Sequence, residues 1–564
     1  MVDGQATTVV KINGNDTRFV VDTGNFFNAM SRAKAASLGL QLRPAPFGFR
    51  VTGVGGDSQQ AQFAVAKKFS VLGTPLEKVA FIVGGTDMGG LLGANLLDIA
   101  DMDVDLAHGK LTLFKPDHCG KSSLAYWAKD GRYEMADIAP RANSVDRRTF
   151  LDVKINGRTM RAMLDSGAYA TVLSSFAARR LGVDLDALST RPGTTVEGVG
   201  SKPTRAWTIP VDSLSVGTET IRHTQMQVID GDFGDRTTDL LLGVDFFLSH
   251  HMFIANSQGR IYFTYNGGRV FSLASAPADQ AMATAGVADK AAAPLASAAD
   301  YALRGQAHLA RGEPDAALAD LDAAVRMEPD HAAYYLARAR IHASKDQAVA
   351  ELADLDKSLA LDGNSADARL MRADLRREQG DRDGAAADVA AAAKLVPAGS
   401  AQTLAIATEY LALDQPGAAL PLLDAWIGVH PHDAMLGQAL NQRCWSRALA
   451  NRMLDEALRD CRKSVRMDST NADFMDSLGM VQLRLGHYAE SIRAYEQALA
   501  STPHSAWSLY GLGLAQLRSG QSEAGHASLA AARKVDPYIA GRFGHFGMAP
   551  PTSVTSPPAT APHH

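Results

Sequence analysis

Cysteine is scarce in this 564-residue chain, and neither sign of charge predominates. The three cysteines, Cys119, Cys444 and Cys461, are too few for a disulfide scaffold, and at least one thiol must stay unpaired within the chain. Cys444 and Cys461 lack zinc-ligand spacing and neighbouring histidines, so we expect no metal site there. The 56 basic residues face 61 acidic ones, a net charge of −5 that offers no basic patch to a phosphate backbone. We therefore expect no nucleic-acid partner.

Long apolar runs are missing as well. No stretch reaches the roughly 18 uncharged apolar residues of a membrane span, so we expect none. The opening sequence MVDGQATTVVKING lacks the charged start and apolar core of a secretory signal. At 46% hydrophobic and 21% charged residues, the chain has the ordinary composition of folded domains.

The chain changes character along its length. Residues 1–271 contain short alternating runs such as TTVVKI and RIYFTY, with Asn-Gly turns, which is typical of β-hairpins. Residues 272–297 are mostly Ala, Ser and Pro, which indicates a flexible linker between modules that fold independently. Residues 298–540 are rich in Ala and Leu with helical periodicity. The Pro- and Ser-rich tail, residues 541–564, is predicted to be disordered.

The helical half repeats. The segment LDAAVRMEP at 321–329 returns six times at a constant interval, except that one interval is slightly longer. Small residues recur at one fixed offset in the best-formed units, at Gly305, Gly479 and Gly513. A helix–turn–helix period of about 34 residues with small residues at the helix crossing resembles the tetratricopeptide repeat (TPR). The resemblance implies a solenoid of about seven units with a concave face. That face is either pure scaffold or a groove for a protein partner.

The β-rich half is built from two copies of one unit, residues 1–115 and 150–271, joined by an inter-lobe linker, residues 116–149. FVVDTG in the first copy aligns with AMLDSG in the second, and each follows an Asn-Gly hairpin. Each triplet is followed by a helix-like stretch ending in Leu-Gly and by a glycine-rich tip, VTGVGG or VEGVGS. Each copy closes with an apolar strand that runs into glycine, GLLG or LLLG.

This doubled pattern resembles the retropepsin-type aspartic proteases, with two half-units on one chain as in the two-lobed pepsin-like enzymes. The resemblance implies a multidomain protein in which an all-β tandem barrel module, a pepsin-like pseudo-dimer, precedes the all-α TPR solenoid. It implies that Asp22 and Asp165 are the catalytic pair. The residues implied to support the pair are Thr23, Gly24, Ser166 and Gly167. The flap residues implied to cover substrate are Gly53, Val54, Gly55, Gly56, Gly198, Val199 and Gly200. Leu92–Gly93 and Leu242–Gly243 match the strand-loops packed under the aspartates.

Two carboxyl groups within hydrogen-bonding distance share one proton, because both cannot ionise cheaply. The ionised partner takes a proton from water while the protonated partner donates to the peptide carbonyl. This chemistry needs no metal and no cofactor, and glycine-rich flaps let the backbone approach an extended peptide closely. We expect an aspartic endopeptidase that acts on a peptide or protein substrate, as a monomer because both aspartates lie on one chain.

Two features depart from the family pattern. Asn25 follows the first triplet where alanine, as at Ala168, is usual, and the flap tips carry no aromatic residue. The alternative function is a non-catalytic TPR adaptor whose degenerate β half binds extended peptides. DMDVD at 101–105 has calcium-like spacing, but Leu106 and Thr112 stand where an EF-hand needs Gly and Glu, so we expect a β-hairpin.

The remaining expectations follow from the resemblance. Similar tandem proteins commonly look exported, so a periplasmic or secreted location is favoured, with a cytoplasmic one as the alternative. The TPR units are expected to recruit substrate or a protein partner to the protease.

Overall fold

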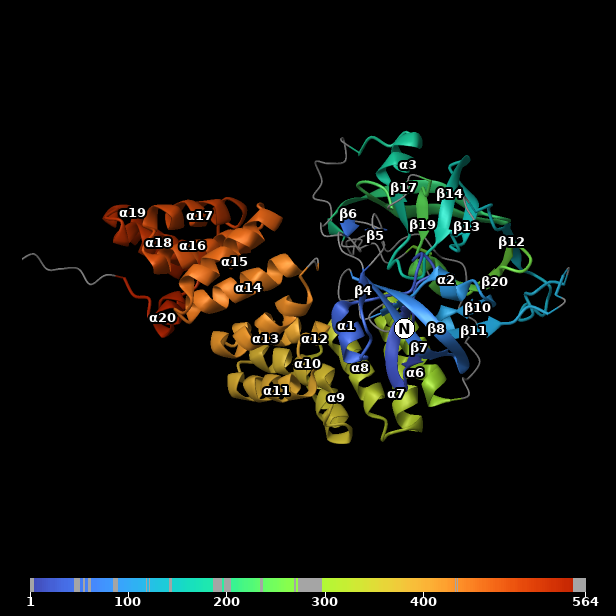
Figure 1. Ribbon diagram of the computed structural model, residues 1–564, viewed down its shortest axis with the longest axis horizontal. Helices are drawn as coiled ribbons and strands as arrows, with labels where there is room; N and C mark the ends of the chain where they lie inside the picture. The colour runs from blue at the N-terminus through green and yellow to red at the C-terminus, as the bar shows by residue number, and fades with distance from the viewer. Residues whose placement is uncertain are drawn as a thin grey trace, which may run out of the picture. The chain divides into compact units, whose positions relative to one another are not determined.

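The computed structural model describes most of the chain. The described residues are 5–44, 51–53, 56–58, 62–84, 90–117, 119–120, 122–141, 145–185, 195–196, 204–233, 237–267, 270–271, 297–431, 433 and 435–550. The chain forms two compact units, residues 1–395 with 432–434, and residues 396–431 with 435–564. Figure 1 shows the strands in blue to green and the later helices in yellow to red.

The first lobe is a closed ring of six strands. The ring runs β1 (Thr7–Ile12), β2 (Asn15–Val21), β9 (Gly90–Leu92), β3 (Ala29–Met30), β8 (Thr74–Val83) and β7 (Gln62–Val71), and β4 (Arg43–Pro44) extends it beside β7. Pairing of β1 with β7 closes the ring. Asn13 and Gly14 have φ angles of 51° and 97°, as the predicted Asn-Gly hairpin turn requires. Alternate side chains point inward, and Ile12, Phe19 and Phe81 fill the core.

The second lobe repeats the same ring. Its strands run β13 (Phe150–Ile155), β14 (Arg158–Leu164), β19 (Leu240–Leu242), β15 (Val172–Ser174), β18 (Glu219–Ile229) and β17 (Thr204–Val216), and β16 (Thr195–Val196) extends it beside β17. β13 pairs with β17 to close it. In each lobe a short helix follows the strand that comes after the aspartate: α1 (Arg32–Ser37) follows β3, and α3 (Ser175–Arg180) follows β15. Ser31 and Ser174 cap the N-termini of these helices. The predicted tandem of β-barrels is confirmed.

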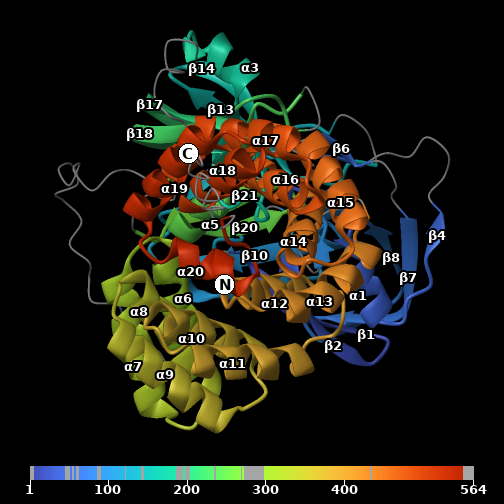
Figure 2. The same cartoon turned by 90° about the vertical axis from the view of Figure 1, so that its left-hand side faces the viewer.

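A five-stranded sheet joins the two lobes. Its order is β11 (Lys110–Phe114), β10 (Asp101–Asp105), β20 (His250–Ala255), β21 (Arg260–Tyr265) and β12 (Glu134–Asp137). β10 and β11, linked by the short 3-10 helix η1 (Leu106–His108), form the hairpin predicted for DMDVD. Figure 2 shows β10, β20 and β21 between the blue first lobe and the green second lobe.

The described part of the inter-lobe linker packs against this sheet. The Trp127 ring stacks on His251 with their centroids 3.9 Å apart, and its Nε1 donates a hydrogen bond of 2.8 Å to Thr264. His251 Nε2 lies 2.6 Å from Asp103 Oδ1, so a partly buried hydrogen-bonded pair lies beside the indole. The linker also supplies β12, which pairs with β21. It is therefore a structural part of the lobe interface.

The first repeat helix packs against the β-rich module. On α6 (Ala298–Ala310), Leu303 lies so close to η1 that a Cβ atom added to Gly109 would be 2.7 Å from the Leu303 Cβ. Ala307 and Ala310 belong to the same buried cluster as Phe247 of the second lobe. The sequence predicted independent modules on either side of residues 272–297. The structure instead attaches α6 to the β-rich core; residues 272–296 lie outside the described part of the chain.

The described residues from 297 onward form seven successive helix pairs. They are α6 with α7 (Pro314–Met327), α8 (Ala332–Ser344) with α9 (Ala348–Leu361), α10 (Ala366–Glu378) with α11 (Arg382–Leu395), α12 (Ala401–Ala412) with α13 (Pro416–Val429), α14 (Leu436–Leu449) with α15 (Leu454–Met467), α16 (Ala472–Leu485) with α17 (Tyr488–Ser501), and α18 (Ala506–Arg518) with α19 (Ser522–Val535), followed by α20 (Ile539–His545). This confirms the helical repeat region predicted from the period of the sequence. None of the described helices is both long and apolar enough to span a bilayer.

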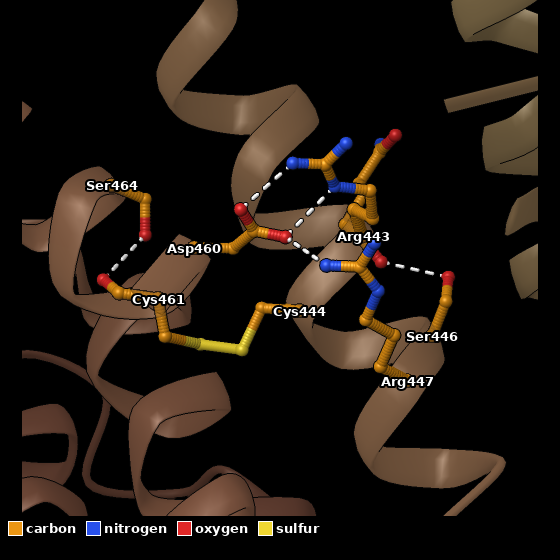
Figure 3. The surroundings of a disulfide bond; sticks show 8 residues. Arg443, Cys444, Ser446, Arg447, Asp460, Cys461 and Ser464 are labelled. Atoms are coloured by element: carbon orange, nitrogen blue, oxygen red, sulfur yellow. Dashed lines mark hydrogen bonds and ion pairs between the residues drawn. A yellow bond between two sulfur atoms is a disulfide. The ribbon is translucent and has the colours of Figure 1, made fainter. Parts of the chain in front are cut away.

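The small residues lie where the helices of a pair cross. A Cβ atom on Gly305 would be 3.2 Å from Leu321, and one on Gly513 would be 2.8 Å from Leu529. In the fifth pair, Cys444 and Cys461 occupy the corresponding places and form a disulfide, with 5.6 Å between their Cα atoms. Figure 3 shows this bond linking the two helices. Cys119 is the free cysteine, as the count of three required.

Arginine–aspartate ion pairs tie successive helix pairs together. The Arg338 guanidinium donates two hydrogen bonds to buried Asp354 in its own pair and a third, of 2.7 Å, to Asp322 of the preceding pair. The same arrangement recurs at two further arginines, each with a buried aspartate of its own pair and one of the pair before: Arg372 with Asp388 and Asp356, and Arg443 with Asp460 and Asp424. These links fix the register between neighbouring units.

Candidate active site

The two predicted aspartates lie at equivalent places in the two lobes. β2 ends at Val21 and runs parallel to β9, and the Asp22 N–H donates to the Leu92 carbonyl at 2.9 Å. β14 ends at Leu164 and runs parallel to β19, and the Asp165 N–H donates to the Leu242 carbonyl, also at 2.9 Å. Because a parallel strand supports both loops in the same way, each aspartate occupies the same position relative to the sheet of its own lobe.

The structure brings the two carboxyl groups together, and they hydrogen-bond to each other. Each also faces the glycine of the opposite triplet. A Cβ atom on Gly24 would lie 2.2 Å from the Asp165 Cγ, and one on Gly167 would lie 2.3 Å from the Asp22 Cγ. Any side chain at either position would therefore occupy the space of the opposite carboxylate.

The hydroxyl residues of the two triplets brace the pair across the lobe boundary. Thr23 Oγ1 donates to the Leu164 carbonyl at 2.8 Å and accepts from the Ser166 N–H at 3.0 Å. Ser166 Oγ donates in turn to the Val21 carbonyl at 2.6 Å and accepts from the Thr23 N–H at 3.2 Å. All four bonds are buried, so the brace holds the carboxyl groups in register without competition from water.

Backbone N–H groups hold one oxygen of each carboxylate. Asp22 Oδ1 accepts from Gly24 and from Asn25, at 3.1 and 2.8 Å. Asp165 Oδ1 accepts from Gly167 at 2.9 Å and from Ala168 at 3.0 Å. Asn25 thus acts through its main chain as Ala168 does, so its departure from the family pattern leaves this contact intact.

The two carboxyl groups are electrostatically unequal. Burial raises the pKa of Asp22 well above its usual value, and the negative charge of Asp165 raises it further. Burial also raises the pKa of Asp165, but the Gly167 and Ala168 N–H groups, the bond to Asp22 and the charge of Arg148 oppose the rise. Two buried carboxyl groups that both have raised pKa values and that interact with each other can hold one proton between them, which suits a pair of one acid and one base.

A second layer of polar residues supports each loop from below. In the first lobe, the Asn28 N–H donates to Asn95 Oδ1 at 2.8 Å, and Asn28 Oδ1 accepts from the Gly93 N–H at 3.0 Å. In the second lobe, Thr171 and Asp245 take the corresponding places, and Thr171 Oγ1 accepts from the Gly243 N–H. None of these four residues was predicted from the sequence. Aligning the two copies beyond the triplets would have found them, because Asn28 and Thr171 follow the aspartate of their own lobe at the same offset.

The strand-loops predicted to pack under the aspartates do so. Leu92 and Leu242 are fully buried. A Cβ atom on Gly93 would be 2.4 Å from the Phe27 carbonyl carbon, and one on Gly243 would be 2.4 Å from that of Ala170. Glycine at these two positions therefore allows the loop after each triplet to close on its support.

The flap residues are described only in part. β5 (Val51–Gly53) and β6 (Gly56–Ser58) form a hairpin with Gly53 opposite Gly56. Val54 and Gly55 at its tip lie outside the described residues. So do all three predicted residues of the second flap, Gly198, Val199 and Gly200.

Nowhere among the described residues do three or more His, Cys, Asp or Glu side chains come together in a way that could hold a metal ion.

Comparisons with known proteins agree with this division of the chain. Residues 8–96 and 151–246 match the family described as Aspartyl protease, and residues 302–366 and 477–540 match the family described as Tetratricopeptide repeat. Both resemblances predicted from the sequence are confirmed. The N-terminal region therefore has an aspartic protease-like fold, and TPR units follow it.

Individual relatives are more distant. Cellulose synthase operon protein C of Komagataeibacter sucrofermentans is 27% identical over 99 residues, which is 15% of this chain and 8% of that protein. The matched part thus spans less than a tenth of that relative. Among solved structures, YrrB, a TPR protein with an unusual peptide-binding site, is 21% identical with a TM-score of 0.29. The match covers 34% of this chain and 95% of YrrB. A TPR protein from Parabacteroides merdae is 15% identical with a TM-score of 0.35 and covers 44% of this chain and 99% of its own.

Proposed function

We propose that this chain is an aspartic endopeptidase that cleaves peptide bonds with a water activated by Asp22 and Asp165. The observation that carries the proposal is the buried, hydrogen-bonded pair of carboxyl groups whose environments favour one proton between them. A degenerate pair kept only for binding would have no need of two intact triplets, two glycines against the opposite carboxylates and a four-bond brace.

The reaction follows from this geometry. The ionised carboxylate takes a proton from water, and the water oxygen bonds to the peptide carbonyl carbon. The protonated carboxyl donates its proton to the carbonyl oxygen, which gives a neutral tetrahedral diol. The carboxyl that took the proton from water then gives it to the amide nitrogen, while the other carboxylate takes a proton from one diol hydroxyl. The carbon–nitrogen bond breaks as the carbonyl of the new carboxylic acid forms, and the pair again holds one shared proton. The substrate would bind as an extended strand under the flap hairpin, held largely by main-chain hydrogen bonds.

The TPR units would recruit the protein substrate or a regulatory partner. Stacked helix pairs present repeated surfaces of the kind that bind peptides and proteins. Tethering a substrate there raises its effective concentration at the active site without changing the chemistry.

We also propose a periplasmic or secreted location. The support for it is the Cys444–Cys461 disulfide, because disulfides persist in oxidising compartments and are rare in the cytosol. Trapping thiols with a maleimide in intact cells tests the location. Two thiols blocked as a disulfide support it, whereas three free thiols favour the cytoplasmic alternative.

The alternative function, a non-catalytic adaptor, is separated from the first by one assay. Cleavage of a casein-like substrate at mildly acidic pH is measured for the parent chain, for Asp22→Asn and for Asp165→Asn, with and without pepstatin. We expect pepstatin-sensitive cleavage by the parent and a loss of at least about a hundredfold in each variant, with unchanged circular dichroism. Binding of the substrate without cleavage by the parent would favour the adaptor.

A further inference from the structure

His250 is fully buried at the junction of α5 and β20, and both of its ring nitrogens face hydrogen-bond acceptors. Nδ1 lies 2.8 Å from the carbonyl oxygen of Phe246. Nε2 lies 3.1 Å from Oε2 of Glu219 and 3.3 Å from Oε1. A carbonyl oxygen and an ionised carboxylate can only accept hydrogen bonds, so each of these contacts needs a proton of its own.

A neutral histidine cannot supply both protons, because its imidazole ring carries a single N–H. The Phe246 carbonyl has no proton to give, so Nδ1 must be the donor at the first contact. The second proton lies between Nε2 and the Glu219 carboxylate, whichever of the two holds it. Ser249 Oγ lies 3.0 Å from Nδ1 but leaves this count unchanged, because without an N–H the ring nitrogen and the carbonyl would face each other with lone pairs only.

The two side chains join different sheets. Glu219 is the first residue of β18, in the closed ring of the second lobe, and His250 is the first residue of β20, in the five-stranded sheet that joins the lobes. We propose that His250 and Glu219 bind one proton as a buried pair, and that this proton ties the ring of the second lobe to the five-stranded sheet. The tie is a pH-sensitive device of the fold that goes beyond the proposed function and does not rest on it.

The other titratable groups around the pair have interactions that leave its proton in place. Tyr265 of β21 has its ring centre 5.9 Å from that of His250. Burial and the charge of Glu219 raise the pKa of Tyr265, so the phenol stays neutral over the range considered below. The remaining groups lie on α5, on β10, β20 and η1, and in the turn between α6 and α7, and they pair as Asp245 with Thr171, Asp103 with His251, Asp105 with His108, and Arg311 with Glu313.

The proton makes the stability of the second lobe depend on pH with a definite sign. In an unfolded chain, histidine releases its proton at about pH 6.5 and glutamate at about pH 4.3. Because the folded contacts need the proton, the folded state binds more protons than the unfolded state above about pH 6.5, and the unfolding constant should rise by up to about tenfold for each pH unit. Between about pH 4.5 and pH 6.5 both states hold the proton, and the tie has its full strength.

The test replaces the carboxylate with its amide. In Glu219→Gln the amide N–H can donate to Nε2 of a neutral His250, so both contacts are kept without the extra proton. Urea unfolding of the full chain is measured from pH 5 to pH 8. Pulsed hydrogen exchange of peptides from β13 and β14 follows the second lobe separately from the helical repeats. Between pH 7 and pH 8 we expect the unfolding constant of the parent to rise up to about tenfold more than that of Glu219→Gln, and between pH 5 and pH 6 we expect the two to change in parallel.

A second variant keeps the test decisive if the first does not fold. His250→Gln removes the other member of the pair, so it should lose the same pH dependence even where it is less stable overall. Glu134→Gln is the matched control, because Glu134 of β12 accepts from the hydroxyl of Thr218, next to Glu219, and faces no histidine; it should keep the parental pH dependence. A parental rise between pH 7 and pH 8 in either Glu219→Gln or His250→Gln would overturn the inference, whether or not the chain cleaves peptides.

Discussion

Thr171 donates two hydrogen bonds to the buried carboxylate of Asp245, from its N–H at 2.9 Å and from its hydroxyl at 2.6 Å. Asp245 lies in the first turn of α5 (Val244–Ser249), directly after the loop that supports Asp165. The same place in the first lobe holds Asn95, which accepts from Asn28 without carrying a charge. One lobe therefore supports its aspartate-bearing loop with an ionisable group, and the other supports its loop with a neutral one.

This difference predicts a pH-dependent stability. Burial raises the pKa of Asp245 to about 6, against the opposing bonds from Thr171 and Phe246. A raised carboxyl pKa means that the folded state binds the proton more tightly than the unfolded state does. As pH rises from about 4 to about 6, the free energy of unfolding should therefore fall, by up to about 3 kcal/mol from this group. Asp245→Asn should be about as stable as the parent at pH 4 and more stable at pH 7.

Urea or thermal unfolding at pH 4 and pH 7 measures the effect. Asp152→Asn, on an exposed position of β13, is the matched control and should leave the pH dependence unchanged. Parallel pH dependence of the parent and Asp245→Asn would contradict the prediction.

The contact between each triplet glycine and the opposite carboxylate gives a second prediction. A methyl group on Gly24 would lie 2.2 Å from the Asp165 Cγ, far inside van der Waals contact. Gly24→Ala must therefore displace Asp165 from the pair, and we expect cleavage to fall at least about a hundredfold because the proton-sharing geometry is lost. Gly120→Ala is the control, since a Cβ atom there would have no atom within 4 Å. Peptidase activity in Gly24→Ala close to that of the parent would refute the arrangement.

The meeting of Asp22 and Asp165 could be predicted from the sequence because its signal is local and occurs twice. An apolar strand, a triplet and a supporting Leu-Gly strand all lie within one lobe-sized segment in each copy. The helical pairs could be predicted for the same reason, since each unit is short and its pattern repeats along the chain.

The lobe interface could not be predicted, because its strands come from distant segments. β10 of the first copy pairs with β20 of the second, and β12 comes from a segment with little apolar alternation. The arginine–aspartate links between helix pairs could have been predicted from the sequence. Arg304, Arg338 and Arg372 recur with the period of the repeat, and each precedes a buried aspartate at the same offset.

The disulfide gives a third prediction, on stability. Cys444 and Cys461 are fully buried at the crossing of α14 and α15, and the bond joins positions separated by 17 in the sequence. Replacing both with alanine should lower the free energy of unfolding of this region by about 3 kcal/mol, because the unfolded chain regains its freedom. Urea unfolding followed by helical circular dichroism measures the loss.

Reduction should reproduce the double substitution, and Cys119→Ala should have no effect. Thiol titration in denaturant should find one free thiol before reduction and three after. Equal stability of the oxidised and reduced chains would show that helix packing alone holds this pair.

Because α6 packs against the β-rich core, removing α6 by truncation should lower the stability of the β-rich module. Ala307 is fully buried and shares its cluster with Phe247 on α5, the helix that follows the Leu242–Gly243 loop under Asp165. A chain that ends at residue 271 would expose this apolar surface to water. A chain that ends at residue 330 would keep α6 covered by α7.

We therefore expect the fragment of residues 1–330 to melt at a higher temperature than the fragment of residues 1–271, and to cleave a short peptide at temperatures where the shorter one is inactive.

In the full chain, Ala307→Asp should lower the free energy of unfolding of the β-rich module by about 3 kcal/mol or more, because it buries a charge without a partner. Val349→Asp, at a position on α9 that is 85% exposed, should change neither stability nor cleavage. Thermal melting and peptide cleavage measured on the same samples decide the matter. Identical melting and activity of the two fragments would mean that α6 does not stabilise the β-rich module.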